Sequence, residues 1–247
     1  MLLSVKDVSS GYRNVSVING ITFDIKEGEI IGLIGLNGAG KSTLLKTILG
    51  LIKTQKGEIT IQGQSILDNH QSYAEKIAYI PETPILYEGL TLKEHLEMTG
   101  LGYGIEQSVI MERALPLLKK FRLDKHLNWF PIHFSKGMKQ KVMIICALIT
   151  DAKLLIIDEP FLGLDPLAIK DFTELLKLKK KQGISILLTT HILSIAPELC
   201  DRYLMLQAGK IRAQGELDSL RENFEMNEAT LEDMYIRMTQ EVTTNEK

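Results

Sequence analysis

Short apolar runs, separated by glycine-containing turns, dominate the first third of the chain. They predict strands at residues 2–8, 18–25, 30–34, 59–61 and 77–80. Two later runs, residues 154–157 and 184–188, lack the alternation of apolar and polar positions, which is typical of parallel strands buried on both faces. With a helix expected at 166–181 and a hairpin at 203–215, the pattern predicts an α/β fold with right-handed crossovers.

A helical segment interrupts this pattern. Helical periodicity dominates residues 91–149, which predicts a helical subdomain inserted into a core formed by residues 1–90 and 150–215. The last stretch, residues 216–247, predicts an amphipathic helix followed by a polar frayed end. Its apolar side chains are expected to pack on the domain rather than bind a cofactor: Met226, Met234, Tyr235 and Met238. Residues 1–247 are therefore expected to form one domain.

Composition and charge narrow the function classes. Lys and Arg number 29 against 31 Asp and Glu, a net charge of -2 that gives no argument for bulk nucleic-acid binding. The first residues lack the features of a signal peptide, and no apolar run approaches the ~20 residues needed to span a bilayer. We therefore expect a cytosolic chain, with any membrane association made through a partner. Cys146 and Cys200 are expected to be packing residues of a reducing compartment.

The segment "IIGLIGLNGAGKSTLL" carries the strongest chemical signal. Gly35, Gly40, Lys41 and Ser42 fill the pattern G-x-x-x-x-G-K-[ST] between a buried strand and a helix. In this setting backbone N–H groups surround phosphate oxygens, the lysine reaches the β and γ phosphates, and the serine hydroxyl binds Mg²⁺. The alternative is a glycine-rich turn that merely matches the spacing. The residues expected to contact the nucleotide are Gly35, Leu36, Asn37, Gly38, Ala39, Gly40, Lys41, Ser42 and Thr43.

A second acidic segment, "LLIIDEP", delivers Asp158 and Glu159 at the carboxyl end of a buried strand, where open α/β sheets bind ligands. Asp158 suits the coordination shell of Mg²⁺. Glu159 is expected to accept a proton from an attacking water, provided that it lies within hydrogen-bond reach. Alone, a solvated strand end is the commoner explanation, but downstream of a phosphate loop the pair indicates a catalytic site.

The helix that follows Ser135 has an unusual charge distribution. Lys136, Lys139 and Lys141 crowd its first turns, where positive charge opposes the helix dipole and costs a few tenths to about 1 kcal/mol per cation. Ser135 stands in the capping position. The arrangement therefore predicts that an anion approaches the start of this helix.

The order of these segments resembles the ATP-binding cassette family. The resemblance implies a P-loop NTPase fold with a RecA-like core, an N-terminal antiparallel β subdomain and an inserted α-helical signature subdomain. It further implies that the signature loop, residues 134–138, caps the nucleotide bound by a second, antiparallel subunit. The anion at the start of the helix would then be the γ-phosphate of the partner's ATP, with contacts from Ser135, Lys136, Gly137 and Met138.

Three further positions match the family. Tyr12 stands where the family places an aromatic side chain that stacks on adenine, although a lone tyrosine near a strand end otherwise indicates packing. Gly163, Leu164 and Asp165 match the loop that passes between the two sites. His191 matches the switch histidine that contacts the γ-phosphate, although a single histidine after a strand can equally be structural.

Two departures from the family pattern stand out. The usual LSGGQ reads FSKGM here, so Ser135 and Gly137 survive, the glutamine is lost, and Lys136 adds a charge. Glu82 replaces a glutamine that bridges Mg²⁺, the attacking water and the coupling surface. A carboxylate there can bind Mg²⁺ but cannot donate as an amide does. The alternative is that Glu82 points to solvent and only shapes the loop.

The segments "YIPETP", "FSKGMKQK" and "IIDEPFLGLDPLAI" look like the Ecs-type ATPases of Gram-positive bacteria, which work with a separate membrane subunit. The resemblance implies an ATP-hydrolysing transporter subunit that uses ATP and Mg²⁺. It implies a head-to-tail homodimer, peripheral on the cytoplasmic side of the membrane, that serves a multi-span membrane subunit, with export favoured over import. The alternatives are a soluble cassette acting on DNA or ribosomes, a small-molecule phosphotransferase and a weakly active regulatory ATPase.

Overall fold

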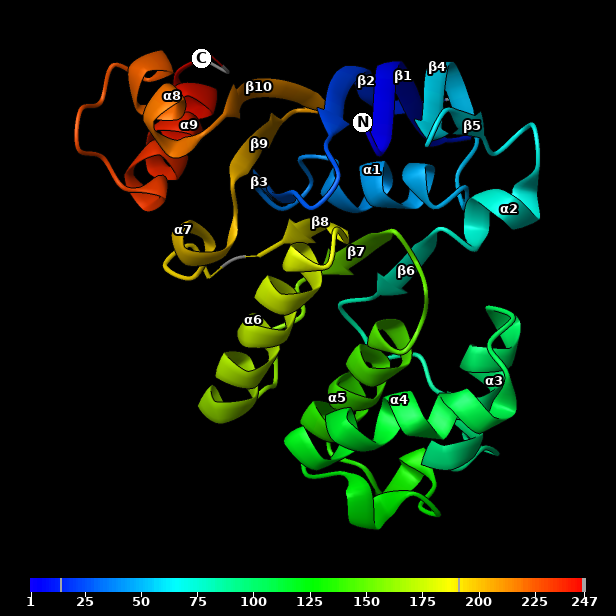
Figure 1. Cartoon of the computed structure of the whole chain (residues 1–247). Coiled ribbons are helices and arrows are strands. Elements are labelled where there is room, and N and C mark those ends of the chain that lie inside the picture. The colour runs from blue at the N-terminus through cyan, green and yellow to red at the C-terminus, as the bar shows by residue number, and fades with distance from the viewer. Residues whose placement is uncertain (14, 191, 246–247) are drawn as a thin grey trace.

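The computed structural model describes residues 1–13, 15–190 and 192–245, in two sheets with helices between and beneath them (Figure 1). The first sheet is antiparallel, in the order β2 (Val15–Ile25), β1 (Leu3–Tyr12), β4 (Thr54–Ile61) and β5 (Gln64–Ser65). The second has the order β10 (Lys210–Gly215), β9 (Arg202–Gln207), β3 (Ile30–Gly35), β8 (Ser185–Thr189), β7 (Leu154–Asp158) and β6 (Ile77–Ile80). Its strands are parallel except for the hairpin partner β10.

Helix α1 (Lys41–Ile48) lies between the two sheets (Figure 1). Its buried Leu44, Leu45 and Ile48 share one apolar cluster with Leu3 of β1 and Leu33 of β3. Because α1 follows β3 directly in the chain, its N-terminus opens at the carboxyl edge of the parallel strands. This edge is where α/β sheets place ligands.

The helical insertion forms the lower end of the molecule in Figure 1. It contains α3 (Leu92–Gly102), α4 (Gln107–Lys120), the 3₁₀ turns Asp124–His126 and Pro131–His133, and α5 (Lys136–Leu148). Its apolar faces share a second cluster with α6 (Pro166–Lys181) and the opposite face of the parallel strands. A short helix, α2 (His70–Ala74), connects β5 to β6.

The predicted fold class is confirmed, but the C-terminal stretch is not the single helix expected. It forms α8 (Leu217–Asn223) and α9 (Leu231–Asn245), which follow the short α7 (Ala196–Leu199) and the β9–β10 hairpin. The helix breaks because Glu225 and Glu228 adopt left-handed backbone angles, and Thr230 then caps α9 by accepting from the Asp233 N–H. The predicted packing of Met226, Met234, Tyr235 and Met238 on the domain is confirmed.

None of the helices within the described ranges has the length and apolar character needed to cross a bilayer.

Candidate nucleotide-binding site

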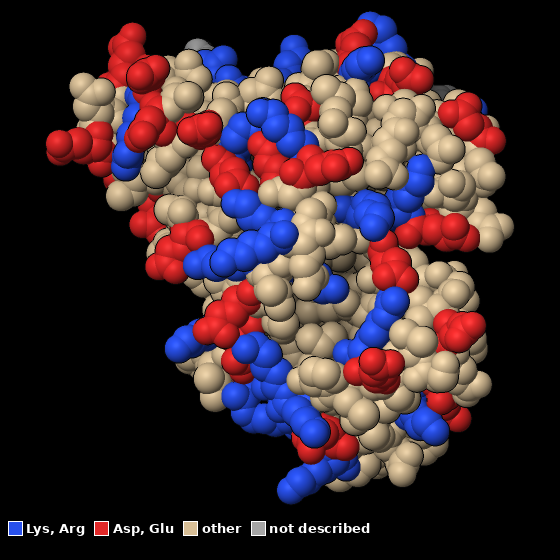
Figure 2. Space-filling model, in the orientation of Figure 1, with Lys and Arg blue, Asp and Glu red and all other residues tan. Residues whose placement is uncertain are grey.

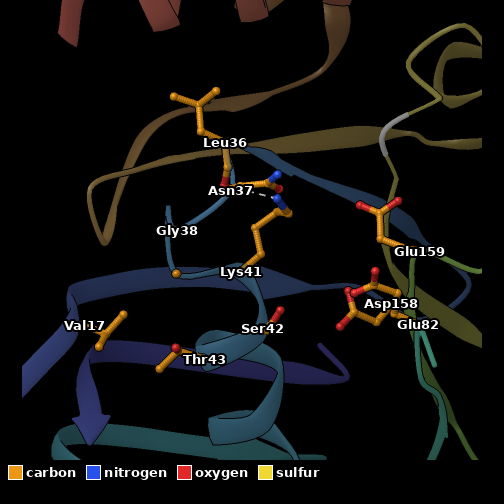
Figure 3. Close-up of a pocket in the computed structure, with 11 residues that line it drawn as sticks. Val17, Leu36, Asn37, Gly38, Lys41, Ser42, Thr43, Glu82, Asp158 and Glu159 are labelled. Atoms are coloured by element: carbon orange, nitrogen blue, oxygen red, sulfur yellow. Dashed lines mark hydrogen bonds between the residues drawn. The ribbon is translucent and has the colours of Figure 1, made fainter. Parts of the chain in front are cut away.

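A cavity of about 310 Å³ opens where β3 passes into α1 (Figure 3). The chain segments around it come from β2, the phosphate loop, the start of α1, and the ends of β6 and β7. Its lining residues are Val17, Leu36, Asn37, Gly38, Gly40, Lys41, Ser42, Thr43, Glu82, Asp158 and Glu159.

The phosphate loop has a backbone that depends on glycine. Gly38 and Gly40 have φ of 79° and 107°, angles that residues with side chains rarely adopt. A Cβ on Gly35 would lie 2.5 Å from the carbonyl oxygen of Leu206, so that position admits no side chain. Gly40 caps α1 without a side-chain hydrogen bond, which leaves N–H groups of the first turn available. The loop therefore fits a phosphate group.

Lys41 is buried beneath the loop, and its Nζ donates to the carbonyl oxygens of Gly35 at 2.7 Å and Leu36 at 3.2 Å. Burial lowers the pKa of Lys41, and the carboxylates of Glu159, Asp158 and Glu82 oppose that shift. Figure 3 shows the ammonium directed toward Leu36 and Asn37, with the three carboxylates across the cavity. A bound phosphate would favour the charged form of this lysine further.

Asp158 and Glu159 are both buried at the end of β7. Thr189 faces Asp158 in the parallel register, and its Oγ1 donates to Asp158 Oδ1 at 2.6 Å. Thr189 Oγ1 also accepts from the Glu159 N–H at 2.9 Å, which helps hold Glu159 at φ 46°. Such left-handed backbone costs on the order of 1–3 kcal/mol and clusters at active sites. Thr189 is not among the residues predicted from the sequence, although its place at the end of the strand "ILLT" could have indicated it.

The donor set fits Mg²⁺. Ser42, Glu82 and Asp158 border the same cavity and offer one hydroxyl and two carboxylates. Across the described parts of the chain, no group of three or more His, Cys, Asp or Glu side chains is arranged to hold a metal alone. Mg²⁺ commonly binds through one or two carboxylates together with nucleotide phosphates and water, so these residues suffice when a nucleotide is bound.

Glu82 is exposed yet borders the cavity beside Asp158, as Figure 3 shows. We expect Glu82→Gln to raise the Mg²⁺ concentration for half-maximal ATP hydrolysis by roughly three- to tenfold, because the metal shell loses a negative charge. The measurement is ATP turnover titrated with Mg²⁺ at saturating ATP. Glu88→Gln, an exposed glutamate of the same loop that does not border the cavity, is the control. An unchanged Mg²⁺ titration would leave Glu82 with a solvent-facing role only.

The signature loop lies outside this cavity. Ser135 caps α5, and its Oγ accepts from the Met138 N–H at 3.2 Å. Met138 is partly buried against the helical core, whereas Lys136 is exposed. Asp165 caps α6 and accepts from the Ala168 N–H at 2.8 Å. None of these four residues borders the cavity around Lys41.

One of the three lysines in the first turns of α5 already has an anionic partner within the chain. Lys141 Nζ pairs with Asp165 Oδ2 at 2.8 Å, which lowers the pKa of Asp165 together with the Ala168 N–H. Lys141 is therefore no longer expected to bind a phosphate. The sequence did not reveal this ion pair, because it depends on how the start of α6 packs against α5. The ion pair joins α5, the helix that follows the signature loop, to the loop at residues 163–165.

Gly137 lies directly against Gly163, since a Cβ on Gly137 would be 2.4 Å from the Gly163 carbonyl oxygen. We expect Gly137→Ala to lower ATP turnover by about 10- to 100-fold, because the start of α5 must shift away from that carbonyl. ATP affinity of the single chain should stay unchanged, since the cavity around Lys41 does not include this residue. Turnover and nucleotide titrations measure the two effects.

The control for this substitution is Gly102→Ala, where an added Cβ has no atom within 4 Å. Full turnover by Gly137→Ala would show that the contact with Gly163 does not matter for catalysis.

The remaining predicted residues are placed as follows. Tyr12 is exposed at the end of β1 and does not border the cavity, whereas Val17, which the sequence analysis did not single out, does. Ala39 is buried in the loop and does not border the cavity. His191 lies outside the described residues.

A phosphate loop at the start of a helix, facing a strand that ends in two carboxylates, defines a P-loop nucleotide-binding cassette. The profile of the family described as "ABC transporter" matches residues 18–162, and the chain belongs to this family.

Two curated relatives come from Bacillus subtilis. The ABC-type transporter ATP-binding protein EcsA is 50% identical over 240 residues, 97% of this chain and 97% of EcsA. The SkfA peptide export ATP-binding protein SkfE is 37% identical over 210 residues, 85% of this chain and 87% of SkfE. This similarity agrees with the Ecs-like resemblance of the motifs.

Two solved structures are similar in fold as well as sequence. The ATP-binding subunit of an ABC transporter has a TM-score of 0.94 at 48% identity, covering 97% of this chain and 100% of that one. A dimeric ATP-binding cassette in a post-hydrolysis state, bound to ADP and Pi, has a TM-score of 0.78 at 26% identity, covering 87% and 99%. The chain is thus an ATP-hydrolysing ATP-binding subunit of the ABC transporter family.

Proposed function

We propose that two copies of this chain form head-to-tail composite sites, hydrolyse ATP with Mg²⁺, and drive a separate multi-span membrane subunit in the export direction. The observation that carries the proposal is the separation of the two halves of the site. The cavity around Lys41 is lined by none of residues 134–138, and we infer that a second copy supplies the cap over its phosphates. A related cassette has been solved as a dimer with ADP and Pi.

In the proposed mechanism Lys41 and the N-terminus of α1 hold the phosphates, with Ser42, Asp158 and Glu82 holding Mg²⁺. Bound Mg²⁺ supplies charge neutralisation at the phosphates. Glu159 accepts a proton from the attacking water. Ser135 and Gly137 of the second copy close the site and exclude solvent. Closure is driven by contacts made to ATP across the interface, since a ligand shifts an equilibrium only by its differential affinity for the two states.

The surface for the membrane subunit is proposed on the helical insertion and the loop before it. The Leu92 N–H donates to the Trp129 carbonyl oxygen at 3.0 Å, which ties the start of α3 to the segment that precedes the signature loop. Large apolar side chains of this region are exposed by 41–72%: Ile85, Tyr87, Trp129, Phe130 and Ile132. Exposed apolar side chains gathered in one region mark protein–protein contacts. A membrane subunit bound at this surface would contact chain segments that are close in sequence to Glu82 and to Ser135.

Support for export comes from the relatives. SkfE is named as an ATP-binding protein for SkfA peptide export, whereas the name of EcsA, an ABC-type transporter ATP-binding protein, gives no direction. The DNA- or ribosome-binding alternative has weaker support, because the net charge is -2 and Figure 2 shows Lys and Arg interspersed with Asp and Glu over the visible face.

The proposal is tested by tagging the chain in its native cell, extracting membranes in mild detergent, and identifying the proteins that co-purify at stoichiometric amounts. The expected result is a multi-span membrane protein, lost when Trp129 and Phe130 are both replaced by Ser. Recovery with ribosomal proteins or DNA would contradict the transporter role.

A further inference from the structure

The helix that follows the signature loop is attached to the loop that carries Glu82. Gln140 lies in the second turn of α5, and its Nε2 donates to the Pro81 carbonyl oxygen at 3.4 Å. Gln140 is 1% exposed and Pro81 is also buried, so this contact is shielded from water. Pro81 comes directly before Glu82, which borders the nucleotide cavity. The contact therefore joins α5 to a residue proposed to bind Mg²⁺.

This attachment is only half made. Within the described parts of the chain, Oε1 of Gln140 is buried and has no hydrogen-bond partner. In an extended segment the N–H and C=O of one residue point to the same side, so a side-chain amide can pair with both. Pro81 offers the carbonyl but has no N–H. A buried polar atom without a partner is unfavourable, so an arrangement that gives Oε1 a donor stabilises this side chain.

Gln140 is also close to the signature loop along the helix. Ser135 caps α5, and Gln140 follows in the second turn. Ser135 is the residue proposed to close over the nucleotide of the second copy. A helix keeps its shape over this distance, because its backbone hydrogen bonds are made within the helix. A displacement of the Glu82 loop that carries Gln140 with it therefore also moves Ser135.

We propose that Gln140 is a positioning residue that links the metal side of one composite site to the signature loop of the other. When the Glu82 carboxylate turns inward to bind Mg²⁺ with ATP, its loop shifts, and Oε1 of Gln140 gains a backbone N–H of that loop as its second partner. Helix α5 then moves Ser135 toward the nucleotide of the second copy. The inference rests on the proposed composite site and on the proposed role of Glu82. The added hydrogen bond is made only in the nucleotide-bound arrangement, so it favours that arrangement.

The first test is Gln140→Met, which keeps an unbranched side chain but removes both the donor and the acceptor. We expect the Mg²⁺ concentration for half-maximal ATP hydrolysis to rise about threefold and kcat to fall about fivefold, because Glu82 and Ser135 are no longer held in register. The affinity of the single chain for ATP without Mg²⁺ should stay the same, since Gln140 does not border the cavity. An unchanged Mg²⁺ titration would overturn the proposal.

The matched control is Tyr103→Phe. The Tyr103 hydroxyl, at the end of α3, donates to the Ile77 carbonyl oxygen and so ties the helical insertion to the opposite end of β6. Its loss should leave the Mg²⁺ titration unchanged. A shift as large as that of Gln140→Met would show a general loosening of the insertion and would contradict a specific role for Gln140.

A double-mutant cycle with Glu82→Gln separates positioning from a loss of packing. Once the Glu82 carboxylate has gone, Gln140→Met should add no further change to the Mg²⁺ titration, because the group to be positioned is absent. Equal fold-changes in both backgrounds would overturn the positioning role.

Trp129 reports the movement in the single chain, because it is the only tryptophan of the sequence and lies in the insertion shortly before the signature loop. Where sedimentation velocity finds no dimer, Mg²⁺ added to the ATP-bound chain should change the Trp129 emission, and Gln140→Met should abolish that change. A response absent from the unaltered chain, or retained in Gln140→Met, would overturn the proposal. A chain that never dimerises but keeps the expected Trp129 response would instead overturn the proposed composite site, so the two failures are distinguishable.

Discussion

Glu159→Gln is expected to bind ATP, to lose about 10²- to 10⁴-fold of its turnover, and to accumulate as a closed dimer. The substitution keeps the size of the side chain and the backbone N–H that donates to Thr189. An amide cannot accept the proton of the attacking water, so ATP stays intact and continues to hold the two copies together. Steady-state hydrolysis measures the first effect, and sedimentation velocity with and without Mg²⁺ and ATP measures the second.

The control is Glu159→Asp, which keeps a carboxylate but withdraws it by one methylene. It should retain more turnover than the amide variant and accumulate less dimer. If the amide variant hydrolyses ATP at the normal rate, another group accepts the proton and Glu159 has been assigned the wrong role.

Lys41→Met is expected to weaken ATP binding by at least about 100-fold, because it removes a charge-assisted contact to the phosphates. Folding should be little affected. The pKa of Lys41 is lowered by burial, which means that its charge is unfavourable where it lies, and methionine fills the same space. Fluorescent-nucleotide titration and thermal melting measure the two quantities.

The burial of Lys41 also gives a pH dependence. Because the pKa of the free chain is lowered and bound phosphate favours the charged form, ATP binding should take up a proton as the pH rises toward that lowered pKa. ATP affinity should therefore fall at alkaline pH, and this decline should be absent in Lys41→Met.

The control for Lys41→Met is Lys46→Met, at an exposed lysine of the same helix, which should bind ATP normally. Normal ATP affinity of Lys41→Met would contradict the placement of phosphate in this cavity.

Much of the fold could be predicted because its signals are local. The apolar runs of β7 and β8 show no alternation, since both of their faces are buried, and the glycines of the phosphate loop sit between a strand and a helix. The break between α8 and α9 could not be predicted in the same way. It depends on left-handed backbone at Glu225 and Glu228, which are residue types without a strong preference for that conformation.

The candidate site shows the same division. Lys41, Ser42, Asp158 and Glu159 could be found from sequence because each stands at the end of an element with a recognisable pattern. The partners of these residues could not, because they come from segments far apart in the chain. Thr189 reaches Asp158 through the parallel register, and Lys141 reaches Asp165 across two helix starts. Long-range pairs of this kind depend on how elements pack.

In the proposed dimer, the phosphate loop of one copy meets the signature loop of the other. Disulfide cross-linking tests it directly, with Asn37→Cys in one tagged chain and Ser135→Cys in a differently tagged chain, both carrying Glu159→Gln. The native Cys146 is buried and Cys200 is half-buried, so the new thiols should react first. A cross-linked pair of the two different chains, formed only with Mg²⁺ and ATP, is the predicted result. ATP binding by both chains without any such pair would contradict the composite site.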